Sequence, residues 1–322
     1  MSKETLFPLI ISNTDMSLWS QCQLRWFRER CQSLRKPGLK NINLDAGAAF
    51  AKGMEVTREA FYQDKLTPAE SIDQGYHKVL EVMYESGNVN DDLKSPERMA
   101  LALVEYFKYF PLESDDVVPA ELEDGTSAIE HKMTAELPIL HPELGVPIIF
   151  KGKLDMLATN MGRTYIVDEK TTKAITSNTG ELLATSGQFI GYAWLCRQLG
   201  ISVAGAKIRK VAIQKTAIKF QEFEVPITDF MIDRWEKATI RKVTDMVGNY
   251  KAFMTLPHNL EEYFVADYSN GCTAYFQPCP YTAGCTTKYG EGFIDTEFEQ
   301  LIWDSESRKE IPLVEFKKLV GL

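Results

Sequence analysis

Two short stretches carry most of the structural information in this chain: Gly152-Lys153-Leu154-Asp155 and Ile166-Val167-Asp168-Glu169-Lys170. Each follows or ends an apolar run typical of a β-strand, and the turn residues at 162–163 predict a hairpin between them. Side chains alternate across a strand, so Asp168 and Lys170 point to one face and Glu169 to the other. The hairpin partner can then bring Asp155 beside Asp168.

This arrangement has a chemical consequence. Two carboxylates close together repel each other unless a divalent cation lies between them. The ammonium of Lys170 can orient an attacking water or offset charge on a scissile phosphate. Acid-x-Lys tripeptides also occur on strand faces that are only solvated, so the pattern alone leaves two interpretations open.

A helix is predicted over residues 179–199, ending at Gly200. Gln188 and Tyr192 are four residues apart within it, so their side chains lie on one face of the helix. The predicted hairpin and this helix follow each other directly in the sequence. Their residues are therefore best interpreted together.

Six residues form an ordered set along the chain: Gly152, Asp155, Asp168, Lys170, Gln188 and Tyr192. This order and spacing resemble the motifs of RecB-like members of the PD-(D/E)XK nuclease superfamily. The resemblance implies that the two aspartates bind Mg²⁺ or Mn²⁺ and that the lysine and glutamine complete the catalytic set. It also implies that the tyrosine contacts nucleic acid and that the fold has a restriction-endonuclease-like core.

The helix predicted over 45–64 departs from the family pattern. RecB-like relatives carry Gly-x-x-x-His here, and the histidine is a metal ligand. In this chain Gly47 is followed by Ala51 at the histidine position, with Glu55 one turn further along. Glu55 is a candidate metal ligand, directly or through water, or a partner for a neighbouring base.

The six cysteines suggest a second metal site. The N-terminus lacks a secretory signal, which predicts a cytoplasmic protein, and clustered cysteines there indicate metal or redox chemistry rather than disulfides. Cys272, Cys279 and Cys285 fall within one Gly/Pro/Tyr-rich loop. The candidates for a fourth thiolate are Cys22 and Cys31.

Residues 11–27 resemble the opening of the iron–sulfur branch of the family, which includes AddB-type nucleases, CRISPR-associated adaptation nucleases and the eukaryotic flap-processing helicase–nuclease. The resemblance implies that Cys22, Cys272, Cys279 and Cys285 hold a 4Fe–4S cluster. The last spacing fits the family pattern. The six residues between Cys272 and Cys279 do not, because the family commonly has two. Zinc, or no metal at all, remain alternatives.

Composition is that of an ordinary globular protein, with 322 residues, 44% hydrophobic and 25% charged. The net charge of −9 argues against a broad basic surface but does not exclude a nuclease. No apolar run is long enough to span a membrane, and no Walker A motif is present, so any helicase or recombination motor is a separate partner. Basic residues gather in two places, each either a solvated face or a DNA contact: Arg25, Arg28, Arg30, Arg35, Lys36 and Lys40, and then Lys207, Arg209, Lys210, Lys215 and Lys219.

The periodicities predict an α/β fold with a central mixed sheet flanked by helices. We expect a single nuclease domain over 1–322. Its parts are a helical N-terminal part at 1–112 with the first cluster cysteine, a catalytic core at 127–225, and a C-terminal helix and cysteine loop at 226–322 that closes onto the N-terminus. Predicted helices cover 14–36, 45–64, 68–87, 94–110, 179–199, 227–254 and 295–305, and predicted strands cover 127–140, 146–157, 164–171, 205–214 and 218–225.

These expectations define a metal-dependent DNA nuclease, by resemblance an exonuclease on single-stranded or free DNA ends in a phage or prokaryotic system. One alternative is a catalytically weak iron–sulfur subunit that binds nucleic acid in a recombination, replication or defence complex. Another is an unrelated metal-thiolate redox protein. That last interpretation leaves the hairpin acids and the Gln-x-x-x-Tyr helix unexplained.

Overall fold

A computed structural model describes residues 5–37, 42–87, 93–256, 260–268, 271–273, 278–288, 290–304, 309–313 and 315. The chain divides into two compact units, which are described separately. The core unit comprises Lys40–Ala135 and Lys151–Glu236, and the terminal unit comprises Met1–Leu39, Glu136–Phe150 and Lys237–Leu322. Both units are discontinuous in sequence, whereas the parts expected from the sequence are consecutive.

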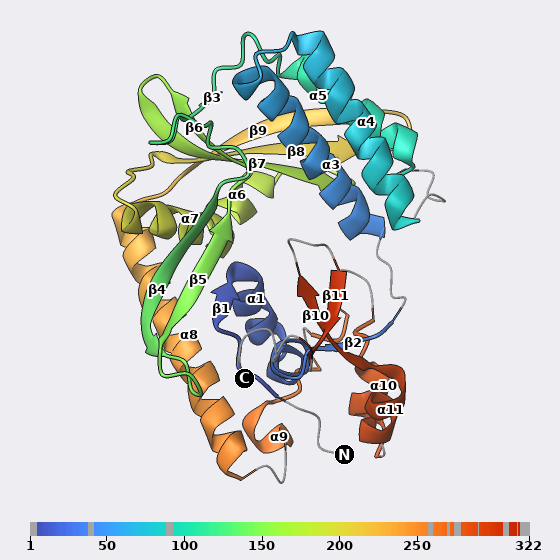
Figure 1. Ribbon diagram of the computed structural model, residues 1–322, viewed down its shortest axis with the longest axis vertical. Helices are drawn as coiled ribbons and strands as arrows, with labels where there is room; N and C mark the ends of the chain where they lie inside the picture. Colours follow the sequence, from blue (N-terminus) through green and yellow to red (C-terminus); the bar gives the residue numbers. More distant parts are fainter. Residues whose placement is uncertain are drawn as a thin grey trace. The chain divides into compact units, whose positions relative to one another are not determined.

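The core unit is built on a five-stranded mixed sheet of order β3-β6-β7-β8-β9 (Figure 1). β7 and β8 pair in parallel, and the other neighbours pair antiparallel. The mixed α/β fold predicted from the sequence is confirmed. The strands are β3 (Val118–Pro119), β6 (Met156–Asn160), β7 (Arg163–Thr172), β8 (Gly205–Ile213) and β9 (Ile218–Pro226).

Helices cover both faces of this sheet (Figure 1). On one face lie α3 (Ile42–Arg58), continued by a π-helical turn (Glu59–Gln63), α4 (Pro68–Ser86) and α5 (Pro96–Tyr109). On the other face lie α6 (Thr179–Ala184) and α7 (Gly187–Gln198). The single helix predicted over 179–199 is therefore two helices, separated at residues 185–186.

Local sequence explains the sharp limits of α4. Thr67 accepts a hydrogen bond from the Glu70 amide while the Glu70 carboxylate accepts one from the Thr67 amide, which forms a capping box. Pro68 occupies the first helical position, where its missing N–H costs nothing. Gly87 ends the helix with φ of +68°, a conformation that glycine adopts without strain.

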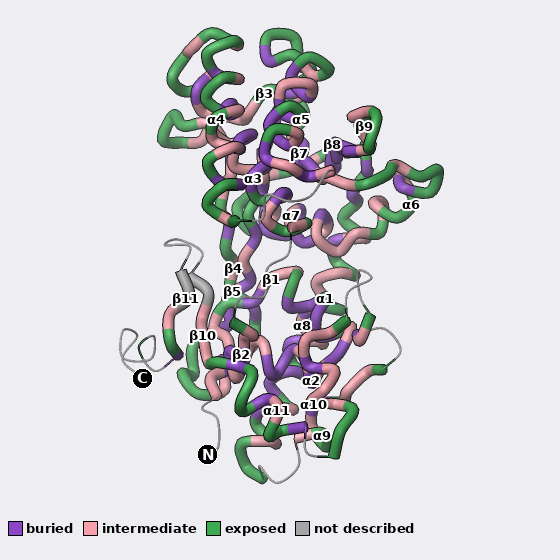
Figure 2. The backbone as a smooth tube through the Cα atoms, turned by 90° about the vertical axis from the view of Figure 1, so that its right-hand side faces the viewer, coloured by how far each residue is buried: buried purple, intermediate pink, exposed green. Residues whose placement is uncertain are grey.

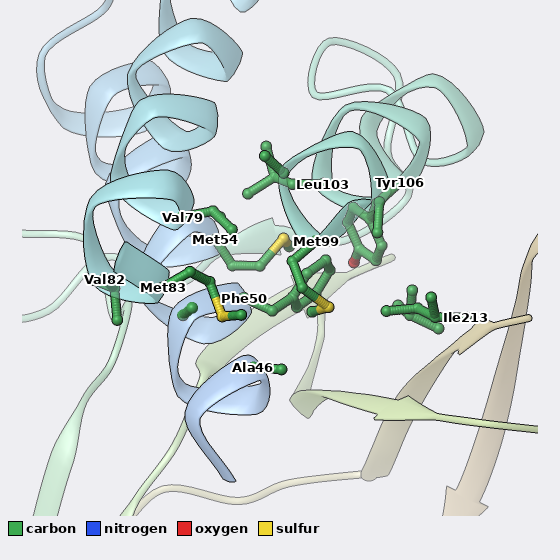
Figure 3. Close-up of a cluster of buried hydrophobic side chains, with 14 of the residues drawn as sticks. Ala46, Phe50, Met54, Val79, Val82, Met83, Met99, Leu103, Tyr106 and Ile213 are labelled. Carbon is green, nitrogen blue, oxygen red and sulfur yellow. The ribbon is translucent and has the colours of Figure 1, made fainter. Parts of the chain in front are cut away.

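An apolar core fills the space between the three-helix layer and the sheet. Phe50 and Met54 of α3 pack with Leu103 and Tyr106 of α5, and Ile213 of β8 closes the cluster (Figure 3). The middle of β7 and most of β8 are buried, as the purple segments of Figure 2 show. Both strands nevertheless carry charged residues, Asp168, Glu169 and Lys170 in β7 and Lys207, Arg209 and Lys210 in β8, so their burial requires partners for these charges.

Three elements have residues in both units: β4 (Lys132–Leu140), β5 (Pro147–Lys153) and α8 (Asp229–Thr255). β5 lies between β4 and β1 (Ile10–Ser12) in a three-stranded sheet. The single strand predicted over 146–157 is in fact β5 followed by β6. Residues 154–155 form the break between them.

The terminal unit contains short elements. Instead of one helix over 14–36, α1 (Asn13–Gln21) and α2 (Gln23–Trp26) are separated by Cys22, whose backbone is extended, and a π-helical turn (Phe27–Cys31) follows. The remaining described elements are β2 (Leu34–Arg35), α9 (Leu260–Tyr263), α10 (Thr282–Thr286), α11 (Gly290–Glu297), β10 (Glu299–Asp304) and β11 (Lys309–Pro312).

The helix predicted over 295–305 is correct only at 295–297, and residue 305 lies outside the described residues. α11 ends at Glu297, and β10 then pairs with β2 through Glu299 with Arg35 and Gln300 with Leu34. That pairing joins opposite ends of the chain, so local periodicity carried no sign of it. None of the described helices has the length and apolar character needed to cross a bilayer.

Candidate active site

The predicted hairpin forms, and it brings the two aspartates together. β6 and β7 pair with Met156 opposite Val167, so Asp155 precedes the first pair and Asp168 follows it. The turn occupies Met161 and Gly162, both with positive φ, one residue earlier than predicted. Asp155 lies in the break between β5 and β6 and approaches Asp168 from the neighbouring strand.

Hydrogen bonds fix the Asp155 carboxylate against β7. Its Oδ2 atom accepts a hydrogen bond of 2.9 Å from the Glu169 backbone N–H. Burial raises the pKa of Asp155, although the nearby Lys170 ammonium opposes this effect. Burial and the neighbouring Asp155 carboxylate raise the pKa of Asp168 to about 8. The two buried acids therefore cannot both ionise easily without a compensating cation.

Lys170 provides part of that compensation. Its Nζ atom lies 2.9 Å from Asp168 Oδ1 and 2.8 Å from Oδ2. Burial disfavours the ammonium, but the carboxylates of Asp168 and Asp155 outweigh burial and raise the pKa of Lys170. The ammonium form is thus favoured, which suits a group that holds a phosphate oxygen or a hydroxide.

One oxygen of the site has no hydrogen-bond donor. Asp168 is 1% exposed, and within the described residues its Oδ2 atom accepts no hydrogen bond, although Lys170 Nζ lies 2.8 Å from it as an ion-pair partner. A buried carboxylate oxygen without a donor is costly unless something else occupies its lone pairs. A hard divalent cation, which prefers carboxylate oxygen ligands, fits this position.

Helix α7 completes this side of the site. Gln188 Nε2 lies 3.5 Å from Asp168 Oδ1 and donates a 3.0 Å hydrogen bond to the Tyr192 hydroxyl. The helix approaches closely because residue 152 is glycine. A Cβ atom there would lie 2.6 Å from Leu195 Cδ1 and 2.9 Å from the Tyr192 ring. The Gly152, Asp155, Asp168, Lys170, Gln188 and Tyr192 set therefore meets in one place.

The opposite face of β7 holds a buried ionic network. Glu169 accepts hydrogen bonds from both terminal nitrogens of Arg58, at 3.0 and 2.5 Å, and one of 2.9 Å from the Tyr106 hydroxyl. Burial opposes ionisation of Glu169, but Arg58 overrides it and lowers the pKa of this carboxyl. The network anchors α3 and α5 to the strand that carries Asp168 and Lys170.

Glu55, the candidate ligand of α3, pairs within its own helix. Its Oε1 atom lies 2.5 Å from Lys52 Nζ. Ala51 adds no ligand. The Lys52 pair occupies one of the two Glu55 carboxylate oxygens, so a role at the metal, directly or through water, stays a prediction.

Glu130 is a third acid near the aspartates, and no motif in the sequence pointed to it. Its backbone N–H donates a 2.9 Å hydrogen bond to the Asp155 carbonyl, and its carboxylate pairs with Lys153. Burial raises the pKa of Glu130 to about 7 against the opposing Lys153 ammonium, with a further upward contribution from Asp155. Its backbone φ of +50° is rare for glutamate. This conformation places Glu130 beside Asp155 and cannot be recognised in the sequence.

Among the described residues, no group of three or more His, Cys, Asp or Glu side chains is arranged to hold a metal ion unaided. Two carboxylates are nevertheless enough for Mg²⁺, which commonly keeps several waters and takes further ligands from substrate phosphates. The donor set of Asp155 and Asp168 fits that mode of binding.

The cysteines selected from the sequence gather in the terminal unit. Cys22, Cys272, Cys279 and Cys285 line one pocket, whereas Cys31 and Cys196 do not. The segment that carries Cys272 comes close to Cys22 because residue 271 is glycine, where a Cβ atom would lie 2.8 Å from Cys22 Cβ. All four are free thiols. The four thiols line the same pocket, but no three of these described side chains are arranged to hold one metal ion.

Two arginines border the thiol pocket. The Arg25 backbone N–H lies 3.4 Å from Cys22 Sγ, and Arg28 Nη1 lies 3.5 Å from Cys285 Sγ. Burial raises the pKa of Cys285 while Arg28 opposes it. Donors to sulfur and neighbouring positive charge are what a thiolate-ligated metal centre needs. The four-thiol donor set fits an iron–sulfur cluster or zinc.

The sequence profile of the PD-(D/E)XK nuclease superfamily matches residues 10–286. The chain belongs to this superfamily. The matched span contains the active-site residues and all four pocket cysteines. No curated protein sequence is significantly similar to the chain.

Two of the solved structures that resemble the chain are SSO0001 and a protein from Eubacterium rectale, and both likenesses are weak. The protein SSO0001 has a TM-score of 0.29 at 13% identity, covering 64% of this chain and 83% of its own. A protein from Eubacterium rectale described as a "putative exonuclease" has a TM-score of 0.43 at 14% identity, covering 74% of this chain and 81% of its own. At these TM-scores neither likeness bears on the activity of this chain.

Proposed function

We propose that the protein is a divalent-metal-dependent deoxyribonuclease that hydrolyses phosphodiester bonds, acting as an exonuclease on single-stranded DNA ends. The observation that carries this proposal is the buried Asp168 Oδ2 atom, which lacks a hydrogen-bond donor and lies next to Asp155 and Lys170. Membership of a nuclease superfamily supports the reaction class. The Gln188-x-x-x-Tyr192 pair supports the RecB-like branch, from which the preference for single-stranded ends is taken.

The residues have distinct roles in this proposal. Asp155 and Asp168 bind Mg²⁺ or Mn²⁺, which when bound polarises the phosphoryl oxygen and makes a bound water more acidic. Lys170 stays protonated and stabilises negative charge on the phosphate or the attacking hydroxide. Gln188 holds Asp168 through its amide and positions Tyr192, whose ring contacts the nucleic acid.

Cleavage of end-labelled single-stranded DNA, duplex DNA and RNA with Mg²⁺, Mn²⁺ or EDTA tests the activity and its substrate preference. Exonuclease action predicts mononucleotides or short products from the first time points and no cleavage of a circular single strand. Cutting of the circle would make the protein an endonuclease. Binding without any cleavage would favour the nucleic-acid-binding subunit.

We also propose that Cys22, Cys272, Cys279 and Cys285 ligate a 4Fe–4S cluster. Their shared pocket and the adjacent Arg25 and Arg28 support this assignment. A cluster bound there would join segments from opposite ends of the chain, which gives it a structural role in the terminal unit. Zinc on the same thiolates is the alternative that metal analysis distinguishes.

A further inference from the structure

The sheet face that carries Asp168 and Lys170 continues across two more strands. In the register of β7 and β8, Lys170 pairs with Lys210. In the register of β8 and β9, Ala212 pairs with Lys219. Paired positions project to the same face of a sheet, and alternate residues of one strand share a face. Lys210 and Lys219 are therefore on the face that carries the active site.

The other basic residues of β8 are on the opposite face and are neutralised there. Lys207 Nζ lies 3.0 Å from Asp116 Oδ2 and 2.9 Å from Glu222 Oε1. Arg209 forms a two-point pair with Asp115, at 2.5 and 2.6 Å, and contacts Glu222 at 2.8 Å. The basic cluster seen in the sequence is thus divided by strand alternation into an internally paired half and an unpaired half.

Lys210 is unusual within its strand. Every other residue of β8 is buried, and Lys210 is half-buried. Within the described ranges, neither Lys210 nor Lys219 forms an ion pair or a side-chain hydrogen bond. Burial and the neighbouring Lys170 ammonium lower the pKa of Lys210, and the Asp168 carboxylate only partly opposes them. A half-buried ammonium without an ion-pair partner is unfavourable in the free protein, and an external anion would supply that partner.

We propose that Lys210 and Lys219 form, together with Lys170, a basic track that binds the phosphodiester backbone of the substrate strand next to the scissile phosphate. The proposal rests on the nuclease function proposed above. It adds the path that the bound nucleic acid takes across the sheet. Adjacent β-strands are about 4.8 Å apart, so the backbone of Lys210 lies about that distance from the backbone of Lys170, its partner in the sheet. Asp155 lies next to β6, whereas the unpaired ammonium groups of Lys210 and Lys219 lie on β8 and β9. The bound nucleic acid therefore extends from the metal site toward β9.

Binding of a fluorescent single-stranded oligonucleotide in EDTA tests the track without catalysis. Lys210→Gln is expected to weaken binding about tenfold and to reduce the slope of log K against log salt by about 0.7, the value for one lost phosphate contact to a single strand. Lys219→Gln is expected to act in the same direction, more weakly, because its side chain is exposed. Lys210→Arg keeps the charge and should retain most of the affinity.

Lys108→Gln is the matched control. Lys108 is an exposed residue of α5, on the other side of the sheet, and pairs with Glu105. The variant loses the same charge but should change neither the affinity nor the salt slope. Equal effects from Lys108→Gln and Lys210→Gln would overturn the track, because they would reflect net charge alone.

Two further measurements separate this inference from the nuclease assignment. In cleavage assays, Lys210→Gln should raise KM more than it lowers kcat. Its melting temperature should equal or exceed that of the wild type, because it removes an unpaired, half-buried charge. A wild-type protein that cleaves DNA while Lys210→Gln leaves KM and the salt slope unchanged would overturn the track alone. A large loss of melting temperature would instead make Lys210 a structural residue.

Discussion

Arg58 and Glu169 form a two-point ion pair directly behind the strand that carries Asp168 and Lys170, with nitrogen–oxygen distances of 3.0 and 2.5 Å. Both side chains are almost completely buried, at 3% and 2% exposure. The pair joins α3 to β7, and the Glu169 backbone N–H also holds Asp155. Glu169 therefore helps to position both candidate metal ligands, Asp155 through its backbone N–H and Asp168 as its neighbour in β7.

Removing one partner of this ion pair should lower the stability of the fold much more than removing both partners. Glu169→Gln leaves Arg58 buried without its counter-ion, and the free energy of unfolding should fall by about 3 kcal/mol. The double variant Arg58→Met with Glu169→Met removes both charges and should recover most of that loss. Urea unfolding of Arg58→Met, Glu169→Met and the double variant beside the wild type measures this coupling. Additive losses in the double variant would show that the pair has no energetic coupling.

The elevated pKa of Asp168 predicts a pH-dependent cost in the absence of metal. The ordinary value is 3.8 and the folded value about 8, so the folded protein holds a proton that the unfolded chain releases between them. Wild-type stability in EDTA should therefore fall from about pH 4 to about pH 8, and Asp168→Asn should lack this decline. Melting temperatures of both proteins across this range are the measurement. A constant difference between them would contradict the assignment of the buried proton to Asp168.

Gly152 should tolerate no larger residue. In Gly152→Ala the new Cβ would press on Leu195 and Tyr192, which should cost about 2 kcal/mol and displace α7 with Gln188. Both stability and kcat should fall. Gly248→Ala is the control, because a Cβ there meets no atom within 4 Å and a helical alanine should add up to about 1 kcal/mol. Equal effects of the two variants would rule out close packing as the reason for Gly152.

Much of the active site was predictable because its residues are close in sequence. Asp168, Lys170 and the Gln188–Tyr192 spacing follow from the alternation of one strand and the turn of one helix. Cys22 was chosen over Cys31 by its position in the motif, and the structure lines the pocket with Cys22. These features depend on local geometry and on a recognisable motif order.

Other features depend on pairings that local sequence does not encode. Glu130 approaches Asp155 through a backbone conformation with positive φ, and nothing in its neighbours predicts that conformation. β10 pairs with β2 from the opposite end of the chain. The break at Asp155 arises because β5 and β6 belong to different sheets. Lys210 and Arg209 point to opposite faces of the sheet. Which of the two residues faces the active site follows only from the pairing of β8 with its neighbours.

The thiol pocket predicts a coloured protein. Protein purified without oxygen should be brown and contain about four irons per chain. Cys22→Ser should remove the colour and lower the free energy of unfolding by about 3 kcal/mol or more, because the cluster closes a loop spanning most of the chain. Cys31→Ser and Cys196→Ser are the controls and should keep the colour. A colourless protein with one zinc per chain would reject the cluster but retain the site.

The most direct measurement of the central claim is single-stranded DNA cleavage by wild type and Asp168→Asn, each with Mg²⁺, with Mn²⁺ and with EDTA. Asp73→Asn, an exposed aspartate of α4 in the same unit, is the matched control. Wild type and Asp73→Asn should cleave only with metal, and Asp168→Asn should be slower by at least about a hundredfold. Cleavage by Asp168→Asn at the wild-type rate, or undiminished cleavage in EDTA, would contradict the assignment.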